Sequence, residues 1–262
     1  MRPNAPRKRF GQHFLAAEET IARIVAVVSP RKGDTLVEIG PGRGAITGEL
    51  AKSGAAMHAV EFDRDLVPWL RERFSSCQNL AIHEADALTF DYPSLGDELR
   101  IVGNLPYNVS SPLLVRLLDF RGQVDDQHFM LQREVVGRIV AKPSTRDFGR
   151  LAVLMQAFYD VESLFDVAPG AFEPPPKVES SVVRMRVRRE ALGRDPAPLQ
   201  QVLAAAFAPR RKMIRTTLLP WLDARNVPRP PLEPTLRPEQ IDVPTWLSIA
   251  DSCGTAMREA SR

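Results

Sequence analysis

The sequence predicts an α/β protein with a seven-stranded, mostly parallel sheet that contains one antiparallel strand, followed by a small helical C-terminal domain. Two observations predict this fold. From Lys32 to about Arg188, short apolar runs alternate with segments of helical periodicity, which is typical of a parallel sheet with crossover helices. After Arg189 short helical segments are interrupted by proline-rich stretches. We therefore expect a first domain over residues 1–189 and a second over residues 190–262.

Seven apolar runs are the predicted strands, and helical segments separate most of them. The strands are expected at residues 35–40, 57–62, 80–85, 100–104, 128–132, 161–167 and 181–187, and the helices at 45–52, 66–74, 112–119, 134–141 and 150–158. Only a proline-rich loop separates the last two strands, so we expect them to pair as an antiparallel hairpin. Beyond a linker at 192–198, further helices are expected at 199–207, 212–222 and 243–253.

The composition is that of a soluble globular protein. The chain has 262 residues, of which 44% are hydrophobic and 26% charged. No apolar run reaches the roughly 18 residues that span a bilayer, and the N-terminus is too polar for a signal peptide, so we expect a cytoplasmic protein. Two cysteines and four scattered histidines form no metal-type spacing, and we expect no metal site.

Basic residues are unevenly distributed, although the net charge is only +3. The first ten residues contain Arg2, Arg7, Lys8 and Arg9 and no acid, and residues 180–215 hold nine basic residues against two acidic ones. This local excess indicates contact with the phosphates of a nucleic acid. An ordinary solvated surface is the alternative.

A glycine-rich turn follows the first predicted strand in "VEIGPGRGAIT", residues 37–47. Gly40, Gly42 and Gly44 occupy alternate positions before a helix. Glycines at such a turn permit positive φ angles and close approach of the backbone to a ligand. Taken alone, the pattern fits a plain tight turn or a dinucleotide site equally well.

Acidic residues at the next two strand ends distinguish between ligands. Glu61 lies 21 residues after Gly40, where a carboxylate can accept hydrogen bonds from ribose hydroxyls, as for NAD or S-adenosylmethionine. Asp86 follows the third strand, in position to accept a hydrogen bond from an adenine amino group. Three successive strand ends would then hold methionine, ribose and adenine, which favours S-adenosyl-L-methionine and a class I, Rossmann-like methyltransferase. The alternative is that both acids are merely polar strand ends.

The fourth strand ends in "NLPY", residues 104–107. The amino group of adenine is a poor nucleophile because its lone pair is delocalised into the ring. The side-chain oxygen of Asn104 and a backbone carbonyl fixed by Pro106 can accept its two N–H bonds and direct the lone pair toward a methyl donor. Tyr107 can stack on a base that has been flipped out of its helix. An Asx-turn before proline is the structural alternative.

These segments resemble one family over nearly the whole chain, the small-subunit ribosomal RNA adenine N6,N6-dimethyltransferases of the KsgA (RsmA) type. The resemblance rests on the following segments: "RKRFGQHFL" (7–15), "VEIGPGRGAIT" (37–47), "VEFDRDL" (60–66), "ADAL" (85–88), "GNLPYNVSSPLL" (103–114), "FMLQREVVGRIVA" (129–141), "FGRLAV" (148–153), "FEPPPKVESSVVR" (172–184) and "FAPRRKMIRTTL" (207–218).

The resemblance implies roles for individual residues. His13 and Leu15 would close over the cofactor, and Gly40, Gly42, Glu61, Asp86 and Asn104 would contact it. Asn104, Pro106 and Tyr107 would bind the target base, with Phe172 helping to sandwich the adenine. RNA contacts are expected at Arg210, Arg211 and Lys212, together with the basic arm of Arg7, Lys8 and Arg9.

The family's substrates are two adjacent adenines in the loop of the 3′-terminal helix of 16S rRNA, each methylated twice within the small ribosomal subunit or its precursor. We expect a monomer with no membrane contact. Two departures from the family's pattern are His13 and Thr216, each in place of an asparagine. His13 could alter cofactor affinity or make it pH-dependent.

Three other functions remain open. An Erm-type enzyme that methylates 23S rRNA shares the "NLPY" chemistry, although the C-terminal segments argue against it. A non-catalytic ribosome-assembly factor on the same fold is made improbable by the complete set of site residues. A DNA or protein N-methyltransferase would more typically carry "PPY" where this chain has Leu105 before Pro106.

Overall fold

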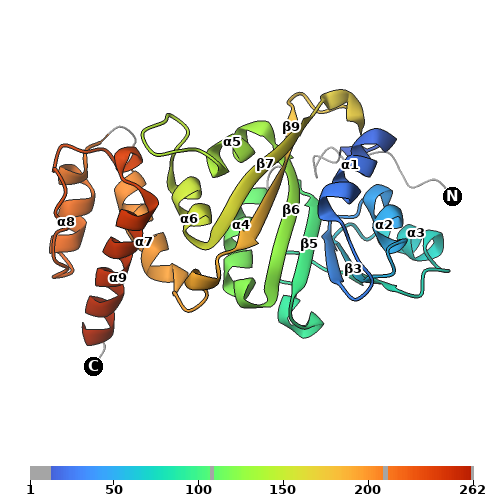
Figure 1. The fold of residues 1–262 in the computed structure, drawn as a ribbon, viewed down its shortest axis with the longest axis horizontal. Helices are drawn as coiled ribbons and strands as arrows, with labels where there is room; N and C mark the ends of the chain where they lie inside the picture. Colours follow the sequence, from blue (N-terminus) through green and yellow to red (C-terminus); the bar gives the residue numbers. More distant parts are fainter. Residues whose placement is uncertain (1–12, 107–108, 209–211, 261–262) are drawn as a thin grey trace. The chain divides into compact units, whose positions relative to one another are not determined.

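The computed structural model describes residues 13–106, 109–208 and 212–260, and it contains the predicted seven-stranded sheet (Figure 1). The strands lie in the order β4-β3-β2-β5-β6-β9-β7. Their bounds are β2 Thr35–Ile39, β3 Ala56–Glu61, β4 Leu80–Glu84, β5 Leu99–Asn104, β6 Val124–Gln132, β7 Tyr159–Val167 and β9 Ser180–Val187. Each predicted strand is present, although β6 begins at Val124 rather than His128.

The sheet is mostly parallel, as predicted. The four neighbouring pairs β4–β3, β3–β2, β2–β5 and β5–β6 are parallel. β9 runs antiparallel to β6 and is inserted between β6 and β7. This arrangement confirms the predicted Rossmann-like, seven-stranded α/β fold.

Helices connect the strands where the sequence predicts them. They are α2 Ala45–Ala51, α3 Leu66–Arg73, α4 Ser110–Leu117, α5 Arg133–Ile139 and α6 Arg150–Phe158, preceded by α1 Glu18–Val28, which we did not predict. α1 and α2 pack on one face of the sheet, where Ile24 and Leu50 meet Leu36, Met57 and Val102 in one buried cluster. This apolar cluster fixes the first strands and the turns that follow them.

A second, two-stranded sheet joins segments that are far apart in the sequence. β1 (Phe14–Leu15) pairs antiparallel with β8 (Phe172–Glu173), so that Leu15 lies opposite Phe172. The backbone amides of Ala16 and Ala17 continue this contact by donating to the Ala171 carbonyl. The segment that begins at His13 is thereby held against the loop that precedes β9.

The chain divides into two compact units. The first runs to Val136 and includes Glu162–Val187, and the second consists of Gly137–Val161 and the chain from Arg188 onward. The second unit therefore includes α6, which lies before the boundary that we expected near residue 190. The functional division into a methyltransferase domain and an RNA-recognition domain stays a prediction.

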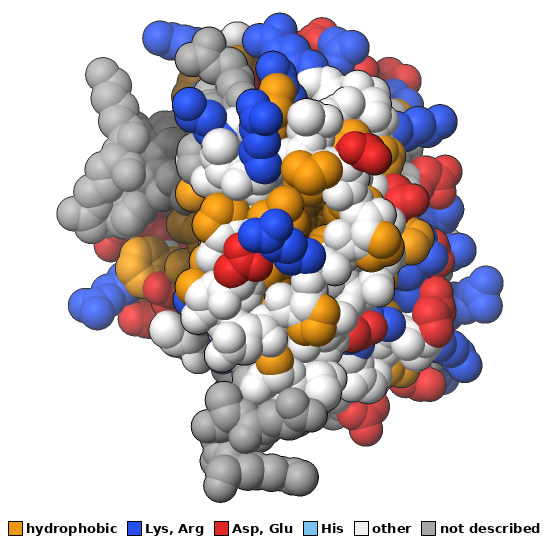
Figure 2. Space-filling model, turned by 90° about the vertical axis from the view of Figure 1, so that its left-hand side faces the viewer, with side chains coloured by type: hydrophobic (Ala, Val, Ile, Leu, Met, Phe, Trp, Pro, Cys, Tyr) orange, Lys and Arg blue, Asp and Glu red, His pale blue; other side chains and the backbone are white. Residues whose placement is uncertain are grey.

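The second unit is helical, with α7 (Pro196–Phe207), α8 (Leu218–Asp223) and α9 (Val243–Ala260). α7 packs on α8 and α9, and both α7 and α9 contact α6. Asp195 caps α7 by accepting a hydrogen bond from the Ala197 amide at 2.9 Å. Trp246 of α9 is fully buried against Phe207. Figure 2 shows Lys and Arg side chains along the upper edge of one face, and side chains of both charges on the right of that view.

Candidate cofactor and base-binding site

The carboxyl ends of four parallel strands bring the predicted site residues to one edge of the sheet. Ile39 of β2 is in register with Val60 of β3 and with Gly103 of β5, and Glu61 is in register with Glu84 of β4. The residues that follow, or end, these strands therefore meet in space, where ligands bind in open α/β sheets. Gly40, Glu61, Asp86 and Asn104 are those residues.

Two adjoining cavities lie at this edge. The first cavity is lined by predicted residues from four parts of the chain, namely His13, Leu15, Gly40, Gly42, Glu61 and Asn104. The second cavity is lined by Asp86 and shares Gly40, Glu61 and Pro106 with the first. Every cofactor residue predicted from the sequence thus lines one cavity or the other.

The glycine turn needs its glycines for both conformation and space. Gly40, Gly42 and Gly44 have φ angles of +68°, +57° and +70°, which side chains disfavour. A Cβ on Gly42 would lie 3.0 Å from Cδ1 of Phe14, and one on Gly44 would lie 2.5 Å from Cε2 of Phe74. The turn therefore stays thin enough for Phe14 to pack directly on it.

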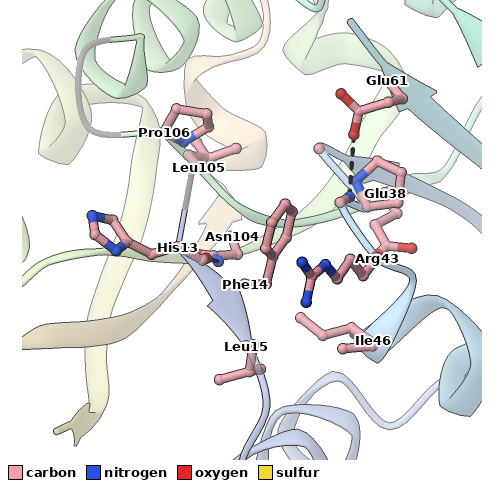
Figure 3. Close-up of a pocket in the computed structure, with 14 residues that line it drawn as sticks. His13, Phe14, Leu15, Glu38, Arg43, Ile46, Glu61, Asn104, Leu105 and Pro106 are labelled. Atoms are coloured by element: carbon pink, nitrogen blue, oxygen red, sulfur yellow. Dashed lines mark hydrogen bonds between the residues drawn. The ribbon is translucent and has the colours of Figure 1, made fainter. Parts of the chain in front are cut away.

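Glu61 is held at the junction of the two cavities. The amide of Gly42 donates to Oε2 at 3.1 Å (Figure 3). The amide of Asp63 donates to Oε1 at 2.8 Å. Only 7% of the residue is exposed. Burial raises the pKa of Glu61 above its usual value, while these backbone donors partly offset the rise. A fixed carboxylate with lone pairs still available suits the two hydroxyls of a ribose.

The second cavity has a mostly apolar lining that also includes Asp86. Asp86 is fixed by the amide of Leu88, which donates to its Oδ1 at 2.8 Å. Phe62, which also lines this cavity, is 58% exposed and ranks among the few large exposed apolar residues that the structure describes. We did not predict a role for Phe62. Its position directly after Glu61 was the available signal. Phe62 follows the last residue of β3, so its side chain is not required to pack in the core of the sheet.

Asn104 ends β5 and faces the first cavity. Its Nδ2 donates to the carbonyl of His13 at 3.2 Å, which leaves Oδ1 as an acceptor for a ligand. Gly103 permits this close arrangement, because a Cβ there would lie 2.6 Å from the carbonyl oxygen of Ile39. Leu105 is buried, and its amide donates to the Met130 carbonyl. The Asn-Leu-Pro segment is thus anchored on both sides.

The segment His13–Leu15 covers the glycine turn. Nδ1–H of His13 donates to the Pro174 carbonyl at 2.7 Å. The guanidinium of Arg43 lies 4.5 Å from the centre of the Phe14 ring, beside which Figure 3 shows it, and 3.6 Å from Glu173. Cation–π and ion-pair contacts therefore hold this segment over the first cavity.

Phe172 is the described site residue that the structure does not bring to either cavity. It is 5% exposed and packs in the buried cluster with Leu15, Met130 and Val182. Its pairing with Leu15 in the small sheet places its side chain in the core. In this structure Phe172 supports the covering segment. The predicted contact of Phe172 with adenine stays a prediction.

Several predicted residues lie outside the described part of the chain. They are Tyr107 of the base-binding motif, Arg7, Lys8 and Arg9 of the N-terminal arm, and Arg210 and Arg211 of the basic cluster. Lys212 is described and is exposed. Among the described residues, no three His, Cys, Asp or Glu side chains are grouped so that they could hold a metal ion. No helix in the same part of the chain is long and apolar enough to cross a membrane.

The site also contains an acid that sequence reasoning missed. Glu38 lines the first cavity and is only 2% exposed. Its Oε2 has no hydrogen-bond partner among the described residues. The signal was a single acid inside the otherwise apolar strand "TLVEI", since a parallel strand covered on both faces has no place for an unpaired charge.

The comparison with known proteins identifies the family. The sequence profile described as ribosomal RNA adenine dimethylase matches residues 4–230. The chain belongs to the ribosomal RNA adenine dimethylase family. The resemblance stated from the sequence motifs is thereby confirmed.

Curated relatives in this family match the chain almost end to end. The chain is 48% identical over 253 residues to the "Ribosomal RNA small subunit methyltransferase A" of Aromatoleum aromaticum, with 96% of this chain and 95% of that protein covered. It is 46% identical over 250 residues to the protein of the same name from Pseudomonas aeruginosa, with 94% and 93% covered. These matches confirm the expected class of enzyme.

Two solved structures share the fold. A dimethyladenosine transferase from Plasmodium falciparum superposes with a TM-score of 0.79 at 20% identity, covering 94% of this chain and 98% of that one. The 23S rRNA methyltransferase ErmE superposes with a TM-score of 0.66 at 27% identity, covering 92% and 99%. Both likenesses extend through most of the helical second unit, because they cover more than nine-tenths of the chain.

Proposed function

We propose that this protein transfers methyl groups from S-adenosyl-L-methionine to N6 of two adjacent adenines in the loop of the 3′-terminal helix of 16S rRNA. Two transfers to each base give N6,N6-dimethyladenosines during assembly of the small subunit. The observation that carries the proposal is the convergence of Gly40, Glu61, Asp86 and Asn104 on two adjoining cavities. The names of the curated relatives indicate that the substrate is the RNA of the small ribosomal subunit.

The residues present fit the proposed cofactor. Asp86 and Phe62 suit an adenine in the second cavity, Glu61 suits a ribose at the junction, and the first cavity suits the methionine end. The unpartnered buried oxygen of Glu38 gives the first cavity the polarity that a cationic ligand requires. When bound, S-adenosylmethionine supplies a methyl group on a sulfonium, which is a strong electrophile.

Asn104 would prepare the target base for attack. Its Oδ1 and the backbone carbonyl before Pro106 accept the two N–H bonds of the adenine amine, so that the nitrogen lone pair turns toward the cofactor. Stacking of the flipped base on Tyr107 is part of the proposal. The nitrogen can release its proton after the methyl group has been transferred, so no general base is required.

Contact with RNA would come mainly from the basic side chains in the segment 210–215. Lys212 and Arg215 are exposed, and their side chains form no hydrogen bond or ion pair with other described residues, although the Arg215 amide donates to the Pro234 carbonyl. Arg210, Arg211 and the N-terminal Arg7, Lys8 and Arg9 complete the proposed phosphate contacts. A cytoplasmic monomer bound to the assembling subunit follows from this substrate and is part of the proposal.

The Erm-type alternative is related to this protein but is less well supported. ErmE shares the fold at 27% identity, whereas the small-subunit enzymes are 46% to 48% identical. A non-catalytic assembly factor would not need Glu61, Asp86 and Asn104 to converge on one site.

Two substitutions test the assigned roles. Asn104→Ala is expected to lower methyl transfer by about 100-fold or more while changing cofactor affinity little, because it removes an acceptor that acts on the base. Glu61→Ala is expected to weaken cofactor binding first, because it removes the ribose acceptor. Single-turnover transfer and calorimetric binding of S-adenosylmethionine measure the two effects. Equal loss of cofactor affinity in both variants would contradict the roles.

A further inference from the structure

A hydrogen bond between Asn104 and His13 decides which end of the Asn104 amide is left for the first cavity. The Nδ2 group of Asn104 donates to the backbone carbonyl of His13 at 3.2 Å, and both residues line this cavity. The two ends of an asparagine amide are not equivalent, because the nitrogen only donates and the oxygen only accepts. A bond that holds Nδ2 therefore keeps Oδ1 as the end that a ligand meets.

The opposite orientation of this amide would be unproductive. The target amine presents N–H groups and needs acceptors. If the Asn104 amide were turned over, its own N–H groups would face those of the amine, and neither could accept. The terminal torsion of an asparagine side chain is broad and roughly two-fold, so an unrestrained amide populates both orientations. Whatever holds Nδ2 in place thus controls the fraction of Asn104 that is competent.

The carbonyl of His13 is available to Asn104 because of its place in the small two-stranded sheet. Bonded and non-bonded pairs alternate along an antiparallel ladder. Ala16 is at a bonded position, since its amide donates to the Ala171 carbonyl at 2.8 Å, and the alternation makes Phe14 bonded as well. His13 therefore falls at a non-bonded position, where the backbone carbonyl points away from the partner strand.

The imidazole ring of His13 supplies a restraint that the ladder does not give at this position. Its Nδ1–H donates to the carbonyl of Pro174, the residue after β8, at 2.7 Å. The next residue, Phe14, is held by the guanidinium of Arg43, which lies 4.5 Å from the centre of its ring. These contacts fix the backbone at His13, and with it the acceptor for Nδ2 of Asn104.

We propose that His13 positions the acceptor amide of Asn104 for methyl transfer. Its carbonyl holds Nδ2, its ring holds that carbonyl in place, and Oδ1 is thereby kept ready to accept an N–H bond of the target adenine. The proposal rests on the role assigned to Asn104 above. It differs from the cofactor contact that the family resemblance implies, because His13 acts here on the rate of transfer between bound substrates.

Substitutions that place a donor at different points of the side chain test this role. The amide nitrogen of asparagine occupies nearly the same place as Nδ1 of histidine, whereas that of glutamine matches Nε2. At saturating S-adenosylmethionine and small subunits, His13→Gln and His13→Ala should lower single-turnover transfer by about tenfold, and His13→Asn by less than about threefold. Cofactor affinity measured by calorimetry should change by less than about threefold in each variant.

A double-mutant cycle with Asn104→Ala separates positioning from a general loosening of the segment. Without the amide there is nothing left to orient, so His13→Ala should lower the residual rate of Asn104→Ala by less than about twofold. Glu18→Ala, at an exposed position in the first turn of α1, is the control and should transfer methyl groups at the unchanged rate. Thermal unfolding checks that each variant folds, and the comparison of His13→Asn with His13→Gln decides even if His13→Ala does not.

The outcomes that overturn this inference differ from those that overturn the proposed function. Equal rates in His13→Asn and His13→Gln, a tenfold loss from His13→Ala in both backgrounds, or weaker cofactor binding with an unchanged rate at saturation would overturn the inference alone. Absence of transfer to small subunits by the unchanged protein, when it binds the cofactor, would overturn the proposed function and this inference with it.

Discussion

At the scale of single residues, His128 shows how burial controls charge in the sheet. It lies in β6, is 3% exposed, and neither ring nitrogen has a hydrogen-bond partner among the described residues. Burial lowers the pKa of His128 to about 4, and Arg100, Arg184 and Arg186 act in the same direction against the opposing charge of Asp126. The ring is therefore neutral at pH 7.

The folded protein should lose stability in acid through His128. The unfolded chain binds a proton below pH about 6.5, whereas the folded chain binds it only near pH 4. The free energy of unfolding therefore falls as the pH drops from 6.5 to 4, by up to about 3 kcal/mol from this residue. Urea unfolding across this range should show a smaller loss in His128→Gln. Identical acid dependence in both proteins would contradict the burial argument.

The site residues that lie at the ends of strands could be predicted from the sequence. The roles of the buried residues Glu38 and Phe172 could not. Gly40, Glu61, Asp86 and Asn104 have fixed offsets from apolar runs, so spacing alone places them at one edge of a parallel sheet. Glu38 was missed because its role depends on a cavity that only the packed structure defines. Phe172 was expected in the site from the family resemblance, and the sequence alone could not show that it packs in the core beside Leu15.

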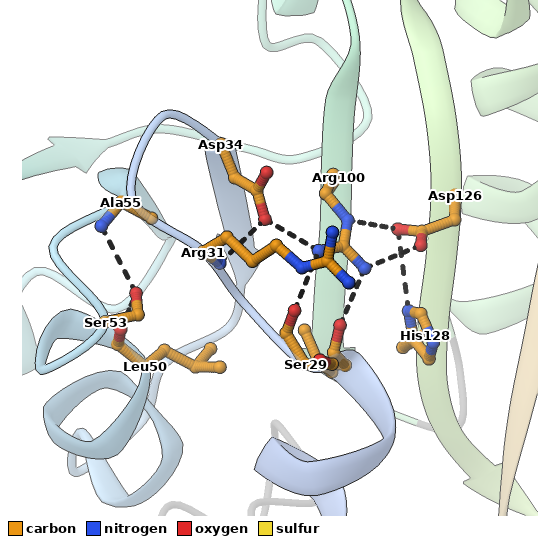
Figure 4. Close-up of polar contacts among 10 residues, drawn as sticks. Ser29, Arg31, Asp34, Leu50, Ser53, Ala55, Arg100, Asp126 and His128 are labelled. Carbon is orange, nitrogen blue, oxygen red and sulfur yellow. Dashed lines mark hydrogen bonds and ion pairs between the residues drawn. The ribbon is translucent and has the colours of Figure 1, made fainter.

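At the scale of elements, Arg100 of β5 links the start of β6, the start of β2 and the end of α1. Its guanidinium donates to both oxygens of Asp126 in β6, to Asp34 before β2, and to the Val28 carbonyl at the end of α1 (Figure 4). Its side chain is only 15% exposed, and that of Asp126 is 6% exposed. This network lies at the opposite ends of the strands from the candidate site.

Removal of Arg100 should destabilise the fold strongly. Arg100→Met leaves a buried carboxylate on Asp126 without its cation, which typically costs about 3–5 kcal/mol. The exposed pair Arg116–Asp119 provides the matched control, and Arg116→Met should cost less than about 1 kcal/mol. Urea unfolding at pH 7 compares them. A similar small loss in both variants would show that the network contributes little.

Elements with a strong local pattern were predicted, whereas those made by distant contacts were not. All seven strands of the sheet follow from short segments that are rich in apolar residues. β1 and β8 have two residues each, and their pairing joins Phe14 to Glu173 across most of the first unit's sequence. No local signal in the chain encodes such a contact. α1 was overlooked because it precedes the regular alternation of strands and helices.

At the scale of the whole molecule, charge should guide the protein to RNA. Reversal of Arg210, Arg211 and Lys212 to Glu should weaken binding to small subunits and reduce the slope of log K against log salt by about one for each lost phosphate contact. Filter binding at several salt concentrations measures both. Lys32→Glu, at an exposed position in the first unit, is the control. Unchanged binding after the triple reversal would exclude these residues from the RNA contact.

The central claim is that this site dimethylates adenines of the small subunit. The most direct measurement is transfer of labelled methyl from S-adenosylmethionine to small subunits that lack the modification, with large subunits alongside and the product mapped by primer extension. We expect N6,N6-dimethyladenosine at two adjacent positions near the 3′ end of small-subunit rRNA and no label on large subunits. Label on large subunits alone, or no transfer by protein that binds the cofactor, would contradict the account.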